Sequence, residues 1–145
     1  MPTIAELVAA GRLERVRPDK REARDLLRHA QAHLESAAAI AARDPAGAYQ
    51  LAYDAARKAV TADMIASGYR VKTDRPGAHA ATVAYAAEAL ADMADAASLR
   101  RLDRMRRLRN RSEYGGITLG AAQVAADLVH AGELVVVVER RVPQT

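Results

Sequence analysis

Apolar residues recur at helical spacing through most of this chain of 145 residues. In the stretch 19–43 the recurring positions are Leu26, Ala30, Leu34, Ala37 and Ile40. In the stretch 46–67 they are Tyr49, Ala52, Tyr53, Ala56, Val60, Met64 and Ile65. Steps of three and four residues place these side chains on one face of a helix. The pattern therefore predicts two long amphipathic helices.

Helix caps and helix breakers fix the ends of these two segments. Asp19 is a good N-cap for the first. In Asp44-Pro45 an N-cap residue stands before a proline at the first helical position, which ends one helix and starts the next. Gly68 is typical of the residue that follows a helix. We therefore expect an antiparallel helix pair with a short connection.

The rest of the chain divides into four further helices. Thr3 and Glu6 have the spacing of a capping box and predict a short first helix that ends near residue 11 or 12. Residues 13–18 are expected to be a connector and the polar residues 69–77 a loop. Further helices are expected over 78–94 and 97–113, and Thr118 is expected to cap a last helix that ends near residue 141.

The run of β-branched residues at 134–138 also suits a strand. A lone strand would have no partner elsewhere in the chain, so we expect helix there. The sequence thus predicts an all-α fold, an up-down bundle of five to six helices. We expect a single domain over 1–145, with a short helix and connector at 1–18 and the bundle at 19–142.

Composition excludes several kinds of site. The chain has no cysteine, so a disulfide or thiolate-zinc site is excluded. His29 and His33 share a helix face, but without a set of carboxylates near them we expect a half-buried or solvated pair and no metal or cofactor. No run of about 18 apolar residues and no apolar leader occurs. We therefore expect a cytoplasmic protein without a membrane partner.

Charge concentrates in one helix. The net charge is only +4, but seven arginines fall within residues 100–111, with Asp103 as the one acid among them. A helical wheel places Leu99, Leu102, Met105 and Leu108 on one stripe and Arg100, Arg104, Arg107 and Arg111 on the opposite side. These outer arginines are either a solvated face or a set of phosphate contacts along a nucleic acid.

Arg109 does not join the outer arginines, because it follows Leu102 by seven residues and Met105 by four. Arg106 and Glu113 lie on the same face. A guanidinium turned toward a protein interior costs several kcal/mol unless it is paired. Either Glu113 pairs with Arg109 or Arg106, or the face borders a cleft or dimer interface where a phosphodiester binds the guanidinium fork.

The stretch around Arg109 resembles the HEPN family of helical bundles. The hallmark of that family is an arginine followed by a polar residue, with a histidine five positions after the arginine. Arg109 and Asn110 match, whereas Tyr114 stands where the histidine is expected. The residues Tyr53-Asp54-Ala55-Ala56-Arg57-Lys58-Ala59, Gly68 and Pro76-Gly77-Ala78-His79 also resemble the long core helix and the glycine–histidine loop of many HEPN proteins, so the resemblance covers about residues 20–142.

The resemblance implies a homodimer that cleaves RNA without a metal ion. Both copies of Arg109 would face one groove, hold the scissile phosphate and stabilise its developing charge. Asn110 would orient that arginine or donate to phosphate, and Arg104, Arg106, Arg107, Arg111 and His79 would contact the RNA.

Tyr114 departs from the family pattern in a way that matters chemically. A phenol with an ordinary pKa near 10 is a poor base at neutral pH, whereas a histidine is a good one. Tyr114 could still donate a hydrogen bond or act as an acid, and Glu113 could act as the base. His79 either supplies the missing base or only fixes the loop after Gly77.

Three functions follow from these observations. The first is an RNA-binding protein and metal-independent endoribonuclease of a toxin–antitoxin or phage-defence system. The second is a non-catalytic HEPN partner of a minimal nucleotidyltransferase, with Tyr114 nucleotidylated or part of a nucleotide-binding patch. The third is a structural helical module, in which Arg109 and Glu113 simply pair and binding to RNA is no stronger than for any protein of this charge.

Overall fold

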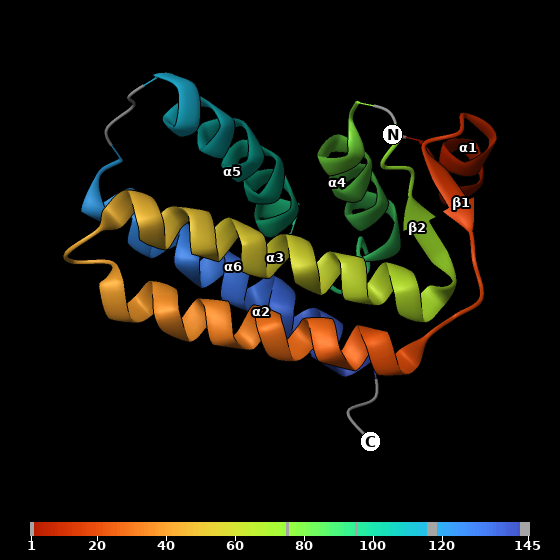
Figure 1. Cartoon of the computed structure of the whole chain (residues 1–145), viewed down its shortest axis with the longest axis horizontal. Helices are drawn as coiled ribbons and strands as arrows, with labels where there is room; N and C mark the ends of the chain where they lie inside the picture. The colour runs from red at the N-terminus through yellow and green to blue at the C-terminus, as the bar shows by residue number, and fades with distance from the viewer. Residues whose placement is uncertain (1, 75, 95, 116–118, 143–145) are drawn as a thin grey trace.

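The described residues form six helices, which confirms the predicted all-α bundle (Figure 1). This computed structural model describes residues 2–74, 76–94, 96–115 and 119–142, without the side chains of residues 96 and 110–115. The helices are α1 (Ile4–Ala9), α2 (Lys20–Ile40), α3 (Pro45–Ser67), α4 (Ala78–Ala89), α5 (Ala96–Gly115) and α6 (Ala121–Arg141). Two short strands, β1 (Leu13–Arg15) and β2 (Tyr69–Val71), complete the described elements.

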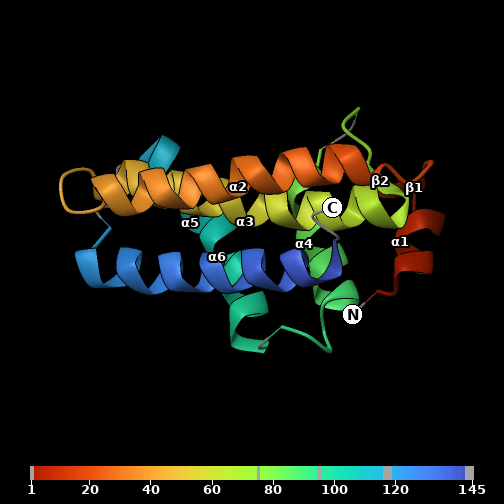
Figure 2. The same cartoon turned by 90° about the horizontal axis from the view of Figure 1, so that it is seen from below.

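The long helices α2, α3 and α6 lie side by side along the length of the molecule (Figures 1 and 2). The connection between α2 and α3 follows the local chemistry that the sequence predicts. The Asp44 side chain accepts a hydrogen bond from the Gly47 N–H at 2.9 Å, and Pro45 opens α3. The chain therefore reverses within a few residues, and α2 and α3 pack as an antiparallel pair.

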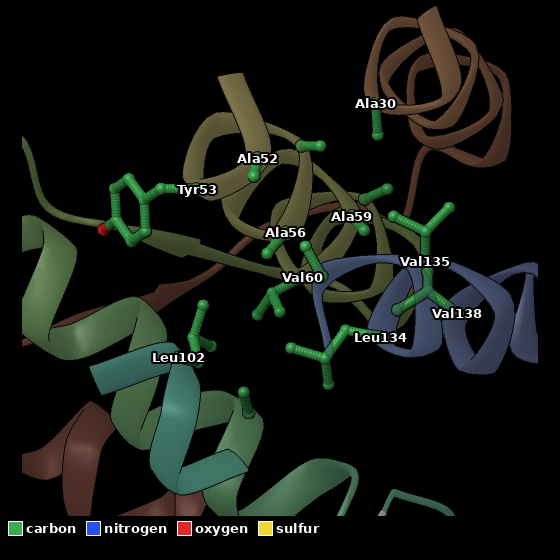
Figure 3. Close-up of a cluster of buried hydrophobic side chains, with 14 of the residues drawn as sticks. Ala30, Ala52, Tyr53, Ala56, Ala59, Val60, Leu102, Leu134, Val135 and Val138 are labelled. Carbon is green, nitrogen blue, oxygen red and sulfur yellow. The ribbon is translucent and has the colours of Figure 1, made fainter. Parts of the chain in front are cut away.

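Small side chains hold α3 at the centre of the fold (Figure 3). Ala52, Ala56 and Ala59 are completely buried. Alanine lets neighbouring helices approach closely, and Leu134, Val135 and Val138 of α6 fill the remaining space beside Val60. The interior thus combines alanine ridges and aliphatic side chains with three buried tyrosines, Tyr49, Tyr53 and Tyr85.

Helices α4 and α5 cross α3 at a steep angle, on the side of α3 that is opposite α2 (Figure 1). Leu102 and Met105 are buried, whereas Arg100, Arg104 and Arg107 are exposed. The amphipathic wheel predicted for this helix is therefore confirmed for its described side chains, and the apolar stripe attaches α5 to the core.

The prediction of a plain connector at 13–18 and a loop at 69–77 is wrong in part. Leu13–Arg15 and Tyr69–Val71 pair as an antiparallel ribbon, with Leu13 opposite Val71. An ion pair between Glu14 and Arg70 crosses it. Strands of three residues are too short to show an alternating pattern in the sequence, and this pair forms only because α3 brings its end back beside the chain entering α2.

The first helix packs onto the bundle through buried Leu7. Several helix boundaries differ from the prediction, since α1 ends at Ala9 rather than near residue 11 or 12 and α2 ends at Ile40 rather than near residue 43. Helix α4 ends at Ala89 rather than near residue 94, because the backbone leaves helical geometry at Leu90. Helix α6 has Gly120 as its N-cap, not Thr118, and the cap has no side-chain hydrogen bond.

Residues 134–138 are helical, as predicted, despite their β-branched side chains. Burial of Val135 and Val138 outweighs the weak intrinsic preference of valine for strands. Among the described helices, α6 alone is long and apolar enough to cross a membrane, a test that the core helix of a folded domain also passes. In this fold its apolar side supplies the core, and the cytoplasmic location stays a prediction.

A polar network lies inside this core. Tyr49 donates a hydrogen bond to Asp127 at 2.8 Å, and Arg101 lies 3.4 Å from the other carboxylate oxygen. Asp127 is completely buried. A buried carboxylate of this kind is tolerated only because both partners are in place.

Replacing the buried carboxylate should therefore destabilise the fold. We expect Asp127→Ala to lower the free energy of unfolding by about 3 kcal/mol, because Tyr49 and Arg101 lose their shared partner. Urea denaturation measures this, with Asp25→Ala as the matched control. Asp25 is half exposed and pairs with Arg28 on the surface, so its loss should cost less than about 0.5 kcal/mol. Equal effects of the two substitutions would contradict the role given to the network.

Two glycines should respond to alanine in opposite directions. Gly68 ends α3 with a φ of 91°, and an added Cβ would lie 3.1 Å from the carbonyl oxygen of Val16. Gly68→Ala should cost about 1–2 kcal/mol. Gly132 lies inside α6 with open space at its Cβ position, so Gly132→Ala should add about 0.5–1 kcal/mol. Thermal unfolding of the pair checks both signs, and a stabilising Gly68→Ala would show that the left-handed cap is not needed.

Candidate functional site

Three helices meet at the phenol of Tyr53. This side chain points from α3 toward α4 (Figure 3) and is almost completely buried. Its hydroxyl lies 3.1 Å from Nδ1 of His79, near the start of α4. The guanidinium carbon of Arg109, from α5, lies 5.8 Å from the centre of the same ring. The structure thus brings His79 and Arg109, which are thirty positions apart in the sequence, to the same phenol.

Local geometry explains why these residues converge. Tyr53 follows Tyr49 by four residues and shares its inward face. Gly77 precedes α4 with a φ of 95°, a conformation that glycine adopts easily, and this turn puts His79 in the first turn of the helix. Arg109 continues the stripe of Leu102 and Met105, as its position on the wheel predicts.

Two more arginines add positive charge around Tyr53. Arg57 lies one turn after Tyr53 on α3 and pairs with Asp54 at 3.7 Å, a long distance for an ion pair. Its Nε is buried and has no hydrogen-bond partner within the part of the chain that the structure describes. Arg106 is bound to Asp103 by two hydrogen bonds of 3.0 and 3.1 Å.

Arg57 was missed as a site residue by the sequence reasoning. The stretch that contains it was noticed only for its resemblance to a HEPN core helix. Its spacing of four residues from Tyr53 was the available signal, because that spacing places both side chains on one helix face. Nothing in the sequence shows that this face meets α5.

The electrostatic environment keeps His79 neutral. Burial lowers the pKa of His79 below its ordinary value of 6.5, and the nearby charges of Arg57 and Arg109 lower this pKa further. Burial also raises the pKa of Tyr53 to about 12, although the surrounding arginines oppose that change. At neutral pH the site therefore offers a neutral imidazole, a protonated phenol and permanently charged guanidiniums.

This combination suits chemistry on a phosphodiester. A neutral imidazole can accept a proton, and guanidiniums bind and stabilise a phosphate that gains negative charge. Among the described residues, no group of three or more histidine, aspartate or glutamate side chains is arranged to hold a metal ion. His29 and His33, the pair weighed in the sequence as a metal site, lie on α2, where His33 Nε2 is 2.7 Å from Nζ of Lys58.

The residues predicted for the site fall into three groups. His79, Arg106 and Arg109 come together around Tyr53. Arg104 and Arg107 lie on the other side of α5, where Arg107 pairs with Asp103 at 2.9 Å. The backbone of residues 110–115 continues α5, but the side chains of Asn110, Arg111, Glu113 and Tyr114 lie outside the described residues, and so does the predicted pairing of Glu113.

Comparison of the chain with protein-family models gives no match, and comparisons with curated proteins and with solved structures give none either. The HEPN resemblance therefore stays a prediction that rests on the residue pattern quoted above.

The environment of His79 predicts a measurable titration. In NMR titrations the imidazole of His79 should lose its proton below pH 6.5, because burial and the neighbouring cations disfavour the imidazolium ion. Arg109→Gln should raise this pKa, since one of those cations is removed. Arg28→Gln, on the exposed side of α2, should leave it unchanged. A pKa of His79 above 6.5, or one insensitive to Arg109→Gln, would contradict the geometry described here.

Proposed function

We propose that this protein binds RNA at the His79–Arg109 site and cleaves it by a metal-independent, HEPN-type transesterification. The observation that carries the proposal is that a neutral imidazole and a guanidinium from different helices meet at one buried phenol. The histidine expected at position 114 is absent from the sequence, and His79 supplies an imidazole beside Arg109 in its place.

The chemical step needs one base and one anion-binding group. His79 takes the proton from a ribose 2′-hydroxyl, and the 2′-oxygen forms a bond to the adjacent phosphorus. The bond from phosphorus to the 5′-oxygen breaks, and the imidazolium returns its proton to that oxygen. The products are a 2′,3′-cyclic phosphate and a 5′-hydroxyl, so atoms and charge balance without a further reactant. Arg109 stabilises the extra negative charge that develops on the phosphate oxygens.

Tyr53 positions the base in this scheme. When His79 Nδ1 carries its proton and donates it to the phenol oxygen, Nε2 is left as the acceptor that the 2′-hydroxyl needs. The high pKa of Tyr53 keeps the phenol neutral, so it does not itself compete as a base. Arg57 and Arg106 would hold the phosphate beside the one that reacts. A dimer would place two such sites on one RNA, consistent with a role in a toxin–antitoxin or defence system.

Cleavage of RNA by the purified protein in EDTA tests the proposal. We expect wild type to cleave, and both Arg109→Ala and His79→Ala to lower kcat/KM by about 100-fold or more, because each removes one half of the chemistry. The rate should fall as pH drops through the lowered pKa of His79, below 6.5, since only the neutral imidazole accepts a proton. Circular dichroism shows whether each variant is folded.

Arg28→Ala is the matched control, because Arg28 lies on the exposed side of α2 and should leave cleavage unchanged. Tyr114→Phe adds a second arm and shows whether that phenol takes part. A folded, RNA-binding wild type that leaves RNA intact would contradict the cleavage step. Cleavage that persists in Arg109→Ala would contradict the site.

One sequence feature favours a second function. Tyr114 replaces the histidine of the HEPN motif, and a tyrosine at this place could be nucleotidylated by a minimal nucleotidyltransferase. Co-expression with such an enzyme would then give a mass increase of one nucleotide on Tyr114 that is absent in Tyr114→Phe. That result, together with intact RNA in the cleavage assay, would favour a non-catalytic partner over a nuclease.

A further inference from the structure

A groove of about 950 Å³ runs between α4 and α5, apart from the His79–Arg109 site. Its apolar lining comes from Ala80, Val83, Ala84 and Ala87 of α4, from Ala91 just after this helix, and from Leu99 of α5. The inward face of α4 carries other residues, among them Ala81, Tyr85 and Ala86. The groove is therefore a second surface of α4 and not a part of the core.

The shape of the groove suits a helix. Ala80, Ala84 and Ala87 follow one another at steps of four and three residues, so they form a straight stripe along one side of α4, and Ala91 lies just beyond the end of the helix. At 1.5 Å per residue this stripe is about 10 Å long, or two helical turns. Alanines permit close approach of another helix, and Val83 and Leu99 offer larger apolar contacts beside them.

The charges on the groove are one-sided. Arg100, Arg104 and Arg107, all of α5, line one wall. Asp103 is the one acid in the lining, and it is bound by Arg106 and Arg107. Arg100 and Arg104 are exposed and have no ion-pair partner in the described part of the chain. A molecule bound in the groove therefore contacts unneutralised positive charge only on the wall formed by α5.

We propose that this groove binds an amphipathic helix of a different protein, with apolar residues against the alanine stripe and acidic residues against Arg100 and Arg104. The partner is inferred from charge complementarity, because acidic side chains would pair with Arg100 and Arg104. Apolar contact with the stripe would supply affinity, and the arginines would fix the orientation of the helix. A single-stranded RNA fits less well, because the lining offers no aromatic ring for base stacking. A second copy fits less well too, because α6, with exposed Val129 and Val136, ends in Arg140 and Arg141.

This proposal is independent of the RNA chemistry. Arg106 and Arg109 serve the site around Tyr53, whereas Arg100 and Arg104 serve the groove, so variants of one pair leave the other pair in place. Such a division would let a protein partner bind beside the RNA site, or restrict access to it, without touching its reacting groups.

Fluorescence anisotropy with a designed peptide tests the groove. The probe is a fluorescein-labelled, end-capped peptide of about 16 residues, long enough to cover the two turns of the stripe and to reach Ala91, with leucine and alanine on one face and glutamate on the flanks. The matched control peptide has lysine at every glutamate position. We expect the glutamate peptide to bind wild type with a Kd in the micromolar range and at least about 10-fold more tightly than the lysine peptide, with affinity falling as salt is added.

Two variants locate the binding. Arg100→Glu/Arg104→Glu should weaken the glutamate peptide by at least about 10-fold and bring its affinity close to that of the lysine peptide. Ala84→Trp should block both peptides by filling the groove, and the control Arg28→Glu should change nothing. Circular dichroism verifies folding, and the charge-reversal variant, which changes only exposed side chains, keeps the test valid if Ala84→Trp misfolds.

Several results would overturn the proposal. They are failure of the glutamate peptide to bind wild type, equal binding of the two peptides, and binding that survives Arg100→Glu/Arg104→Glu. Sedimentation adds one more, because self-association that is lost in Ala84→Trp and competes with the peptide would assign the groove to a second copy of this chain. None of these outcomes depends on whether the protein cleaves RNA.

Discussion

The fold depends on the small side chains of α3, because they let neighbouring helices pack close enough to bury it. Six of its alanines are completely buried, and they allow α2 and α6 to pack close on either side. With so little volume from alanine, the larger buried side chains of α3 carry the contacts to other elements. Two of them are tyrosines, and each reaches across to a different helix: Tyr49 to Asp127 of α6 and Tyr53 to His79 of α4.

Three buried tyrosines each form a hydrogen bond to a side chain of another helix, but the partner of Tyr53 differs in kind from the other two. Tyr49 and Tyr85 each donate to a buried carboxylate, Asp127 and Asp63, and an arginine binds each carboxylate in turn. These two networks are neutralised and serve stability. Tyr53 meets an imidazole instead of a carboxylate, so the arginines beside it keep a positive field around His79. That difference makes the third tyrosine the centre of a candidate site rather than another structural network.

The arginines of α5 divide by direction, and the division separates two interactions. Arg101 binds buried Asp127, Arg106 and Arg109 lie toward Tyr53, and Arg100 and Arg104 face the groove beside α4. Successive residues on a helix point about 100° apart, so a dense run of arginines inevitably faces several surroundings. One helix thereby contributes to the core, to the site proposed to bind RNA and to the groove proposed to bind an acidic helix.

The sequence by itself determined the helices, the caps at Asp19, Asp44 and Gly68, and the inward position of Arg109, because caps and apolar periodicity act over a few residues. It did not reveal the β1–β2 ribbon, since three-residue strands have no readable period and need a partner placed by α3. Nor did it decide between the two roles of His79 or select Arg57. Only the tertiary structure brought these side chains to Tyr53, because the crossing of α3, α4 and α5 depends on packing between residues far apart in the chain.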